Sequence, residues 1–234
     1  MRGLDSESGY VLKTAVIAGS SGLIGRECLR LLLERSDYTR VVALVRRRQG
    51  LADPPNKEKY EELITTFDDL GSLAPIPADH AFCALGTTIR KAGSKEAFAR
   101  VDRDYVANFA YWARAGGAEA ICVVSSVGAD ASSGNFYLAV KGEMEEGVAE
   151  QRFPSTHIMR PSVLLGSREE SRSGERIAAA TLKILNPLLV GPLRNYRAIQ
   201  ADTVAAAMVA AANSGQLERY VHFHDGIEAL AKTH

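Results

Sequence analysis

The stretch AGSSGLIG, residues 18–25, follows a short apolar run at residues 14–17 and begins a segment with helical periodicity. Its three glycines, spaced G-x-x-G-x-x-G, stand where the chain turns from a predicted strand into a predicted helix. A helix N-terminus presents unpaired N–H groups and the positive end of the helix dipole, so a phosphate can bind there when no Cβ blocks its approach. A tight turn without a ligand is the alternative. The position after the first strand favours dinucleotide binding by Gly19, Ser20, Ser21, Gly22, Leu23, Ile24 and Gly25.

Strand-like apolar runs alternate with segments of helical periodicity along the chain. This alternation, with short connections, predicts an α/β fold: a doubly wound, mostly parallel, Rossmann-like sheet with helices on both faces. No repeat or linker divides the sequence, so we expect a single domain over residues 1–234, with the residues after about 160 on the substrate side. The predicted strands are 14–19, 40–46, 63–67, 80–86, 120–126 and 156–161, with a short apolar run at 220–223; the predicted helices start near Gly22, cover 94–116 and about 135–152, lie around 177–185, and follow Asp202.

The composition excludes several classes of function. Lysine plus arginine and aspartate plus glutamate both number 28, so no net charge would attract nucleic acid or an anionic membrane. No apolar run approaches the roughly 18 residues that a membrane span needs, and the first residues do not resemble a secretory signal. The three scattered cysteines fit reduced thiols. We therefore expect a cytoplasmic protein without a membrane span, whose oligomeric state the sequence leaves open.

The residue after the second predicted strand indicates which nicotinamide cofactor is preferred. About 20 residues past the glycines, an acidic side chain favours the free ribose hydroxyl of NAD(H), whereas an arginine accommodates the 2′-phosphate of NADP(H). This chain has Arg46 there, followed by Arg47 and Arg48, and no acid. A basic loop that only faces solvent is the alternative. Because Arg46 ends the strand, we expect NADP(H) to be preferred over NAD(H), with Arg47 near the cofactor and Arg48 in solvent.

A second group of residues suggests chemistry in addition to binding. Tyr137 and Lys141 lie four positions apart on a predicted helix and so share one face, while the fifth predicted strand ends in Ser125 and Ser126. The phenol of a free tyrosine has a pKa of about 10, and a nearby ammonium favours the phenolate. A serine hydroxyl beside it can hold a carbonyl or alcohol oxygen. The alternative, a half-buried tyrosine next to a lysine that reaches solvent, fits the spacing alone equally well.

Together these motifs resemble the short-chain dehydrogenase/reductase superfamily, in its extended or atypical branch. The order is the glycine turn, the serines after the fifth strand, Tyr-x-x-x-Lys and then MRPSVLLG. The stretches CALGTT, VDRDYV, SSVGADASSGNFYLAVKGEME and ESRSGE further resemble the Tat-interacting-protein-like oxidoreductases and their bacterial relatives. The resemblance runs from about Lys13 to the C-terminus, and the joint match is specific where each motif alone is weak.

The resemblance implies a Rossmann-type sheet that binds NADP(H) beside a Ser/Tyr/Lys site. It implies that Tyr137 is the acid–base residue and that Lys141 also contacts the nicotinamide ribose. It assigns the substrate oxygen to Ser126, with Ser125 as the alternative. The further cofactor contacts that it implies are Leu85, Gly86 and Thr87 after the fourth strand, and Pro161 and Ser162 after the sixth.

The sequence departs from the superfamily pattern at two places. CALG stands where Asn-x-Ala-Gly or Ala-Gly-Ala is commoner, and Thr66-Phe67 stands where an aspartate often meets the adenine. The second departure leaves the adenine contacts undefined.

Other polar residues have weaker claims to a function. His222 and His224 alternate along a short strand without a cysteine or carboxylate cluster beside them, so no metal site is predicted. Arg160 either orders the strand end or reaches the substrate, and the sequence leaves both open. The polar segment 167–176 is expected to be a mobile loop on the substrate side. Three glutamates on the predicted helix that carries Tyr137 are expected to form a solvated face: Glu143, Glu145 and Glu146.

These observations predict an NADP(H)-dependent oxidoreductase that acts on a small carbonyl/alcohol pair of undefined identity. Two other classes remain open: an NADPH-binding, redox-sensing regulator with a protein partner and little turnover, and an epimerase or dehydratase for nucleotide sugars. A sensor does not need the complete set of Ser126, Tyr137 and Lys141, which favours the enzyme. The short chain after the sixth strand leaves little material for a sugar–nucleotide pocket.

Overall fold

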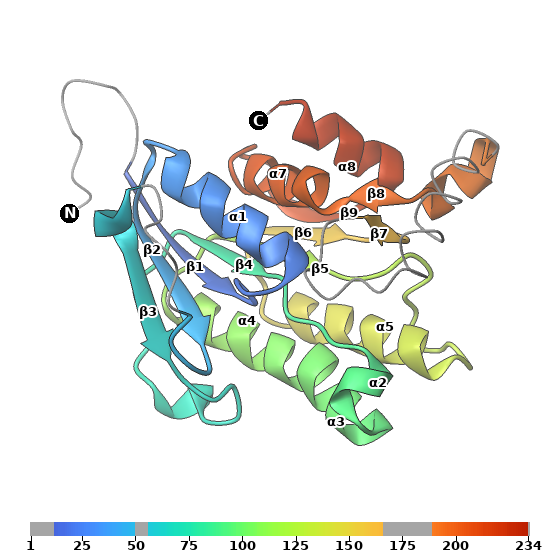
Figure 1. The fold of residues 1–234 in the computed structure, drawn as a ribbon, viewed down its shortest axis with the longest axis horizontal. Coiled ribbons are helices and arrows are strands. Elements are labelled where there is room, and N and C mark those ends of the chain that lie inside the picture. The colour runs from blue at the N-terminus through green and yellow to red at the C-terminus, as the bar shows by residue number, and fades with distance from the viewer. Residues whose placement is uncertain (1–11, 50–55, 166–188, 234) are drawn as a thin grey trace.

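The structure of the chain is a computed structural model that describes residues 12–49, 56–165 and 189–233. Within these residues, seven parallel strands form one sheet in the order β3-β2-β1-β4-β5-β6-β9, which confirms the predicted doubly wound α/β fold (Figure 1). The strands are β1 (Lys13–Ala18), β2 (Tyr38–Val45), β3 (Tyr60–Ile64), β4 (His80–Cys83), β5 (Ala120–Val124), β6 (Ser155–Met159) and β9 (Glu218–His222). A separate two-stranded sheet pairs β7 (Leu164–Leu165) with β8 (Ile199–Gln200).

Helices cover both faces of the main sheet (Figure 1). On one face lie α1 (Leu23–Glu34), α7 (Ala201–Ala212) and α8 (His224–Ala231), and on the other lie α4 (Tyr105–Ala115) and α5 (Phe136–Ala149). The shorter segments are α2 (Ile89–Ala92), α3 (Lys95–Ala99), a π-helical turn η3 (Arg100–Asp104), and the 3-10 turns η1 (Lys57–Lys59), η2 (Leu70–Ser72) and η5 (Gly191–Tyr196).

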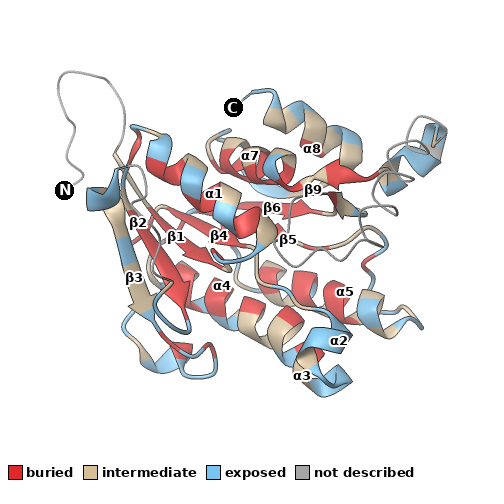
Figure 2. Ribbon diagram, in the orientation of Figure 1, coloured by how far each residue is buried: buried red, intermediate tan, exposed pale blue. Residues whose placement is uncertain are grey.

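Side chains alternate across each strand and so supply two large apolar layers, one under each group of helices. Figure 2 shows buried residues, in red, on the inner strands and on helices of both groups. In β1, Ala15 and Ile17 pack into the layer under α1 and α7, whereas Val16 and Ala18 pack into the layer under α4 and α5. Because both faces are covered, the inner strands consist of nearly continuous apolar residues. The packed strands thus form a rigid sheet, and the candidate site lies at the edge formed by their carboxyl ends.

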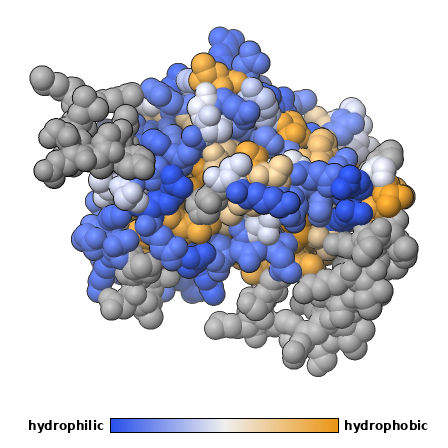
Figure 3. Space-filling model, turned by 90° about the horizontal axis from the view of Figure 1, so that it is seen from above, coloured by the Kyte–Doolittle hydropathy of each residue, from blue (hydrophilic) through white to orange (hydrophobic). Residues whose placement is uncertain are grey.

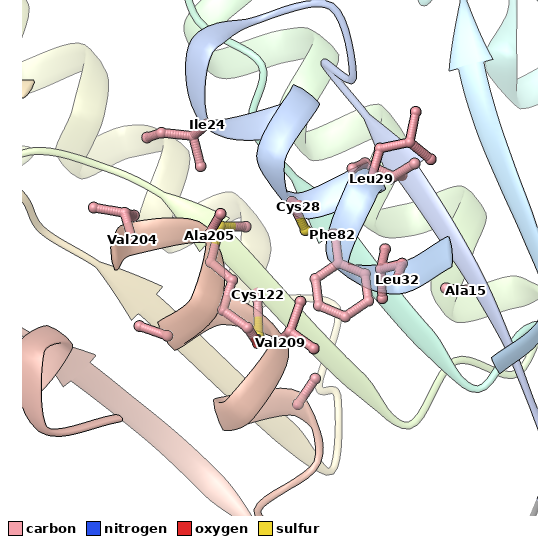
Figure 4. Packing of buried hydrophobic residues seen from close by; sticks show 14 of the residues in the cluster. Ala15, Ile24, Cys28, Leu29, Leu32, Phe82, Cys122, Val204, Ala205 and Val209 are labelled. Atoms are coloured by element: carbon pink, nitrogen blue, oxygen red, sulfur yellow. The ribbon is translucent and has the colours of Figure 1, made fainter. Parts of the chain in front are cut away.

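Figure 4 shows the layer between α1 and α7, where Cys28 and Cys122 lie among packed aliphatic side chains. Cys83 lies in the other layer, so each of the three cysteines of the sequence is buried and free of a disulfide. Burial raises the pKa of all three thiols, which therefore stay protonated and unreactive at neutral pH.

Several element boundaries differ from the sequence prediction. The edge strand β3 ends at Ile64, before the predicted end at residue 67, because its mixed polar and apolar residues are half-buried or exposed and give no clear apolar run. The predicted helix over 94–116 consists of α3, η3 and α4 in succession, with Ser94 capping its start. The predicted helix around 177–185 and the predicted loop at 167–176 lie outside the described residues.

A buried hydrogen-bond chain at the amino ends of β2 and β4 involves Tyr38, His80 and Asn213. Asn213 Nδ2 donates to the Tyr38 hydroxyl (2.9 Å), which leaves that hydroxyl to donate its own proton to His80 Nδ1 (2.6 Å). His80 is therefore an acceptor at Nδ1, and protonation there would break the chain. Burial, with a smaller contribution from the charge of Lys13, lowers the pKa of His80 to about 4.

This histidine should make the protein less stable in mild acid. Between about pH 6.5 and about pH 4, His80 is protonated in the unfolded state but stays neutral in the native state. The free energy of unfolding should therefore fall by about 2–3 kcal/mol over this range. Burial also lowers the pKa of His157 to about 4, so His157 adds to the slope of unfolding free energy against pH. Urea unfolding at a series of pH values measures it. His80→Gln should flatten the slope and His224→Gln should not; equal slopes for all three proteins would contradict the assignment.

In the described part of the chain, no helix is long and apolar enough to cross a bilayer. The face seen in Figure 3 is mostly hydrophilic, with hydrophobic residues in small separate groups.

Candidate active site

Most of the predicted site residues follow the carboxyl ends of strands, which lie on one edge of the parallel sheet. The strand order reverses between β1 and β4, because β2 and β3 extend the sheet on one side of β1 and the later strands extend it on the other. In doubly wound sheets, ligands bind outside the carboxyl ends of the strands at such a reversal. The glycine turn follows β1 and the segment of Leu85, Gly86 and Thr87 follows β4, so both border this position.

Two of the three glycines are required by the packing of the turn itself. Gly19 has φ +87°, and a Cβ there would lie 2.5 Å from the carbonyl carbon of Ala84. A Cβ on Gly25 would lie 2.1 Å from the Gly19 carbonyl oxygen. The turn after β1 therefore packs directly against the end of β4 and the first turn of α1, whether or not a ligand is bound.

Gly22 is less constrained by packing. Its backbone is ordinary and extended, and a Cβ there would lie 3.2 Å from the Gly19 carbonyl oxygen, a tight contact that a small shift relieves. It is the N-cap of α1, whose first turn has no side-chain cap and no acidic residue. Uncapped N–H groups beside a glycine that exposes them form the cradle that a phosphate requires. Ser21 and Gly22 are exposed, whereas Ser20 and Ile24 are buried. These residues fit the pyrophosphate of a dinucleotide.

Arg46, Arg47 and Arg48 are all exposed directly after β2. Arg46 forms no ion pair with another residue in the described part of the chain, but its charge acts on the phenol of Tyr105. The next residue after the triplet, Gln49, donates to the Ser20 hydroxyl (2.8 Å), which joins the arginine segment to the glycine turn. The arginine side chains thus begin beside the turn, with their charge open to solvent.

The two serines after β5 have different surroundings. Ser125 is buried, and its hydroxyl donates to Glu145 Oε1 at 2.6 Å. Ser126 is only half-buried, and its hydroxyl contacts the adjacent Val127 carbonyl at 3.3 Å. Of the two hydroxyls, the one on Ser126 is the more accessible to a ligand.

Tyr137 and Lys141 lie on successive turns of α5, which begins where Asn135 accepts hydrogen bonds from the Tyr137 and Leu138 N–H groups (3.0 and 3.2 Å). Tyr137 is 36% exposed and packs against the buried ring of Phe98, with the ring centroids 5.7 Å apart. Lys141 is buried, and its Nζ lies 2.7 Å from Asp102 Oδ1. An accessible phenol therefore stands one helical turn from a buried ion pair.

The expectation of a solvated acidic face on α5 is wrong for Glu145. This residue is 1% exposed and binds Arg160 through two hydrogen bonds (2.8 and 2.7 Å) and Arg219 through one (3.2 Å), besides accepting from Ser125. The structure thus gives Arg160 a role in ordering the end of β6. Glu143 lies 2.6 Å from Arg103 and Glu146 is exposed, so the expectation holds for the outer side of the helix only.

Asp102 and Glu145 were not among the predicted site residues, although both touch predicted ones. The spacing of Tyr137, Lys141 and Glu145 could have indicated that Glu145 lies near the site. Residues four apart share a helix face, and Tyr137 was expected to face the sheet edge. Asp102 stands in the VDRDYV stretch, but no spacing rule in the sequence relates it to Lys141.

The remaining predicted contacts border the same edge. Thr87 N–H donates to Asp102 Oδ2 (2.8 Å), and the Pro161 carbonyl accepts from Val127 N–H (3.0 Å), which joins the segment after β6 to the segment after β5. Ser162 is half-buried next to Pro161. At the adenine side, the departure at Thr66-Phe67 is followed by Asp68, whose carboxylate accepts from the Tyr105 hydroxyl (2.6 Å).

The two histidines near the C-terminus have protein partners. His222 Nε2 lies 3.0 Å from His157 Nδ1, and His224 lies 3.2 Å from Asp225. Among the described residues, no group of three His, Cys, Asp or Glu side chains is arranged to hold a metal ion.

A doubly wound parallel sheet with a glycine turn after its first strand is typical of dinucleotide-binding proteins, and comparison with known proteins agrees. A family model described as NAD(P)H-binding matches residues 19–215, and the chain belongs to that family. Protein HTATIP2 of Rattus norvegicus is 38% identical over 211 residues, which cover 88% of this chain and 85% of the relative. The protein named "fmp52, mitochondrial" of Emericella nidulans is 35% identical over 172 residues, which cover 71% of this chain and 73% of the relative.

Solved structures with low sequence identity share the fold. The UDP-Glc/GlcNAc 4-epimerase of Campylobacter jejuni has a TM-score of 0.65 at 11% identity, covering 94% of this chain and 82% of that chain. Bordetella bronchiseptica WbmH in complex with NAD+ has a TM-score of 0.64 at 16% identity, covering 94% and 80%. These structures show that the fold is shared, while the family model and the relatives confirm the predicted resemblance to NAD(P)H-binding proteins. The compartment of this chain stays a prediction, since the fungal relative is named mitochondrial.

Proposed function

We propose that the protein is an NADP(H)-dependent oxidoreductase for a small carbonyl/alcohol pair. The observation that carries this proposal is the accessible phenol of Tyr137 one helical turn from the buried ammonium of Lys141, on the strand edge that also carries the uncapped N-terminus of α1. A protein that only binds a dinucleotide does not require this phenol, so removing it distinguishes the two classes of function.

The roles of the residues follow from their positions. When bound, the reduced nicotinamide supplies a hydride to the carbonyl carbon. Tyr137 gives its proton to the carbonyl oxygen, one helical turn from the ammonium of Lys141. Ser126 holds the same oxygen by a hydrogen bond, since the hydroxyl of Ser125 is already bonded to Glu145.

The cofactor-binding residues follow the strand edge. Gly19 to Gly25 hold the pyrophosphate through backbone N–H groups, and Arg46 with Arg47 binds the 2′-phosphate. The nicotinamide half would be held by residues of the segments after β4 and β6: Leu85, Gly86, Thr87, Pro161 and Ser162. Lys141 contacts the nicotinamide ribose.

The proposal extends to the organisation of the chain as one domain with its substrate side after residue 160. In support, β9 pairs with β6 in the main sheet, and β7 and β8 pair with each other just beyond Pro161. Both halves of the chain thus contribute to the described strand edge.

Gly22→Val tests the glycine turn and should weaken NADPH and NADH alike, by about tenfold. A valine side chain has room at the cost of a small shift against the Gly19 carbonyl, so the fold should survive while the side chain covers the N–H groups of α1. Fluorescence titration of both cofactors measures the loss. Gly71→Val, at a position with no neighbour within 4 Å, is the control. An unchanged affinity in Gly22→Val would identify the turn as one without a ligand.

The proposed reaction is tested with a panel of aldehydes, ketones and quinones, added to the NADPH-loaded protein while the absorbance of the reduced nicotinamide is followed. Substrate-dependent loss of absorbance is expected with at least one carbonyl compound. Tight NADPH binding without turnover on any of them would favour the redox-sensing regulator.

A further inference from the structure

Two buried charges meet beneath the strand edge, where Lys141 Nζ lies 2.7 Å from Asp102 Oδ1. The two side chains are 6% and 1% exposed, so solvent screens neither charge. An isolated charge in such surroundings is strongly disfavoured, and removing one partner of a buried pair leaves the other uncompensated. Each of these residues therefore determines the state of the other.

Asp102 also binds the segment that follows β4. Its second oxygen, Oδ2, accepts a hydrogen bond from Thr87 N–H (2.8 Å), and a Cβ on Gly86 would lie 3.4 Å from Oδ1. The carboxylate thus joins three parts of the fold: the turn η3, the helix α5 and the segment after β4. It does so from a π-helical turn between α3 and α4, a backbone form that is often found at functional sites.

The ammonium of Lys141 has three N–H donors. The contact with Asp102 occupies one of them, and in the described part of the chain the ammonium makes no other hydrogen bond. The remaining donors are available for the hydroxyls of a ligand. Held by one bond, the lysine can keep its position while it binds with the others.

We propose that Asp102 is a positioning residue of the cofactor site, which keeps Lys141 charged, aims its free N–H groups at the cofactor ribose, and holds Gly86 and Thr87 beside the same ligand. This rests on the proposed function. Asp102 itself touches neither cofactor nor substrate and acts through Lys141 and the backbone of Thr87.

Few other titratable groups face the ion pair. From β4, the Cys83 thiol feels both charges, but burial raises its pKa to about 12, so it stays neutral. Tyr137 and Glu145 flank Lys141 along α5, and Glu145 is bound to Arg160 and Arg219. The segment after β4, residues 84–88, contains no ionisable side chain. Of the groups named, Asp102 is the one in contact with the Lys141 ammonium.

A double-mutant cycle on NADPH affinity tests this proposal. Asp102→Asn keeps an acceptor for Thr87 N–H but removes the charge, Lys141→Met removes the ammonium, and the third variant carries both changes. Asp102→Asn should weaken NADPH about tenfold, with a loss that grows from about pH 6 to about pH 9 as the uncompensated ammonium gives up its proton. Lys141→Met should show a loss that does not vary over this range. The double variant should bind like Lys141→Met, because Asp102 acts through the lysine.

Thermal unfolding of the same variants provides a second readout. The double variant should be more stable than the sum of the two single losses predicts, because it leaves no charge unpaired. If Asp102→Asn fails to fold, the double variant should still fold and bind NADPH as Lys141→Met does. Asp104→Asn, two residues further along η3 and paired with Arg103 at the surface, is the matched control and should bind NADPH normally.

Independent, multiplying losses in the two single variants would overturn the proposal, as would a loss in Asp102→Asn that is equal at every pH. Failure of the double variant to fold would also overturn it. If the unmodified protein binds no NADPH, both this proposal and the proposed function are wrong. If it binds NADPH and the two residues act independently, only the positioning role is wrong.

Discussion

Tyr137→Phe should leave NADPH affinity nearly unchanged while slowing carbonyl reduction by about a hundred- to ten-thousandfold, which is the usual contribution of general acid–base catalysis. The change removes one oxygen and keeps the ring, so the contact with Phe98 persists. With Tyr137 36% exposed, the loss of its hydroxyl should also have little effect on folding. The step that gives a proton to the carbonyl oxygen would lose its donor. Steady-state rates and NADPH titrations on the same preparation separate the two effects.

Tyr111→Phe is the matched control, since Tyr111 is 60% exposed on α4 and lies outside the proposed site. It should bind NADPH and reduce substrate like the unmodified protein. Full reductase activity in Tyr137→Phe would remove the acid–base role. A protein that senses NADPH without turning it over predicts that Tyr137→Phe is silent in every assay.

Arg46→Asp should erase or reverse a preference for NADPH over NADH. A charge-assisted contact between arginine and phosphate contributes about 1.5–3 kcal/mol, which is roughly ten- to a hundredfold in affinity. The Arg46 side chain is exposed at the end of β2, beside the glycine turn, with no ion pair to another described residue that a phosphate would have to displace. An aspartate at the same position would instead repel the 2′-phosphate and accept from a free ribose hydroxyl.

Affinities of both cofactors, measured by titration for the unmodified protein, Arg46→Asp and Arg48→Asp, test this expectation. Arg48→Asp adds the same charge change two residues further along and should retain the preference. Equal affinities of the unmodified protein for NADPH and NADH would contradict the role of Arg46.

The sequence predicted the sheet well because its inner strands are covered on both faces. Runs such as VVALV in β2 and AICVV in β5 must be apolar on both sides, so they are visible without alternation. β3 is an edge strand with half-buried residues, and its position was three residues off. The π-helical turn inside the predicted helix 94–116 gave no signal, because its residues have ordinary helical propensity and tertiary contacts of Asp102 accompany the distortion.

The positions of the candidate residues were predictable where a motif follows a strand, but not where side chains meet across the fold. The glycine turn, Arg46, Ser126 and the Tyr137 helix all follow from strand ends and local spacing. Asp102 and Lys141 are 39 residues apart in the sequence and meet only because η3 and α5 pack together. Glu145 was predicted to face solvent because glutamates usually do. Its two arginine partners are distant in the sequence, since Arg160 directly follows β6 and Arg219 lies in β9.

The most direct test of an NADP(H)-dependent oxidoreductase with Tyr137 as its acid is isotope transfer. NADPH that carries deuterium at the transferable position of the nicotinamide is mixed with the protein and a carbonyl substrate from the panel, and the alcohol is analysed by mass spectrometry. We expect deuterium on the carbinol carbon with the unmodified protein, and about a hundred- to ten-thousandfold slower incorporation with Tyr137→Phe. A protein that binds this NADPH yet yields no deuterated alcohol from any carbonyl compound would contradict the account.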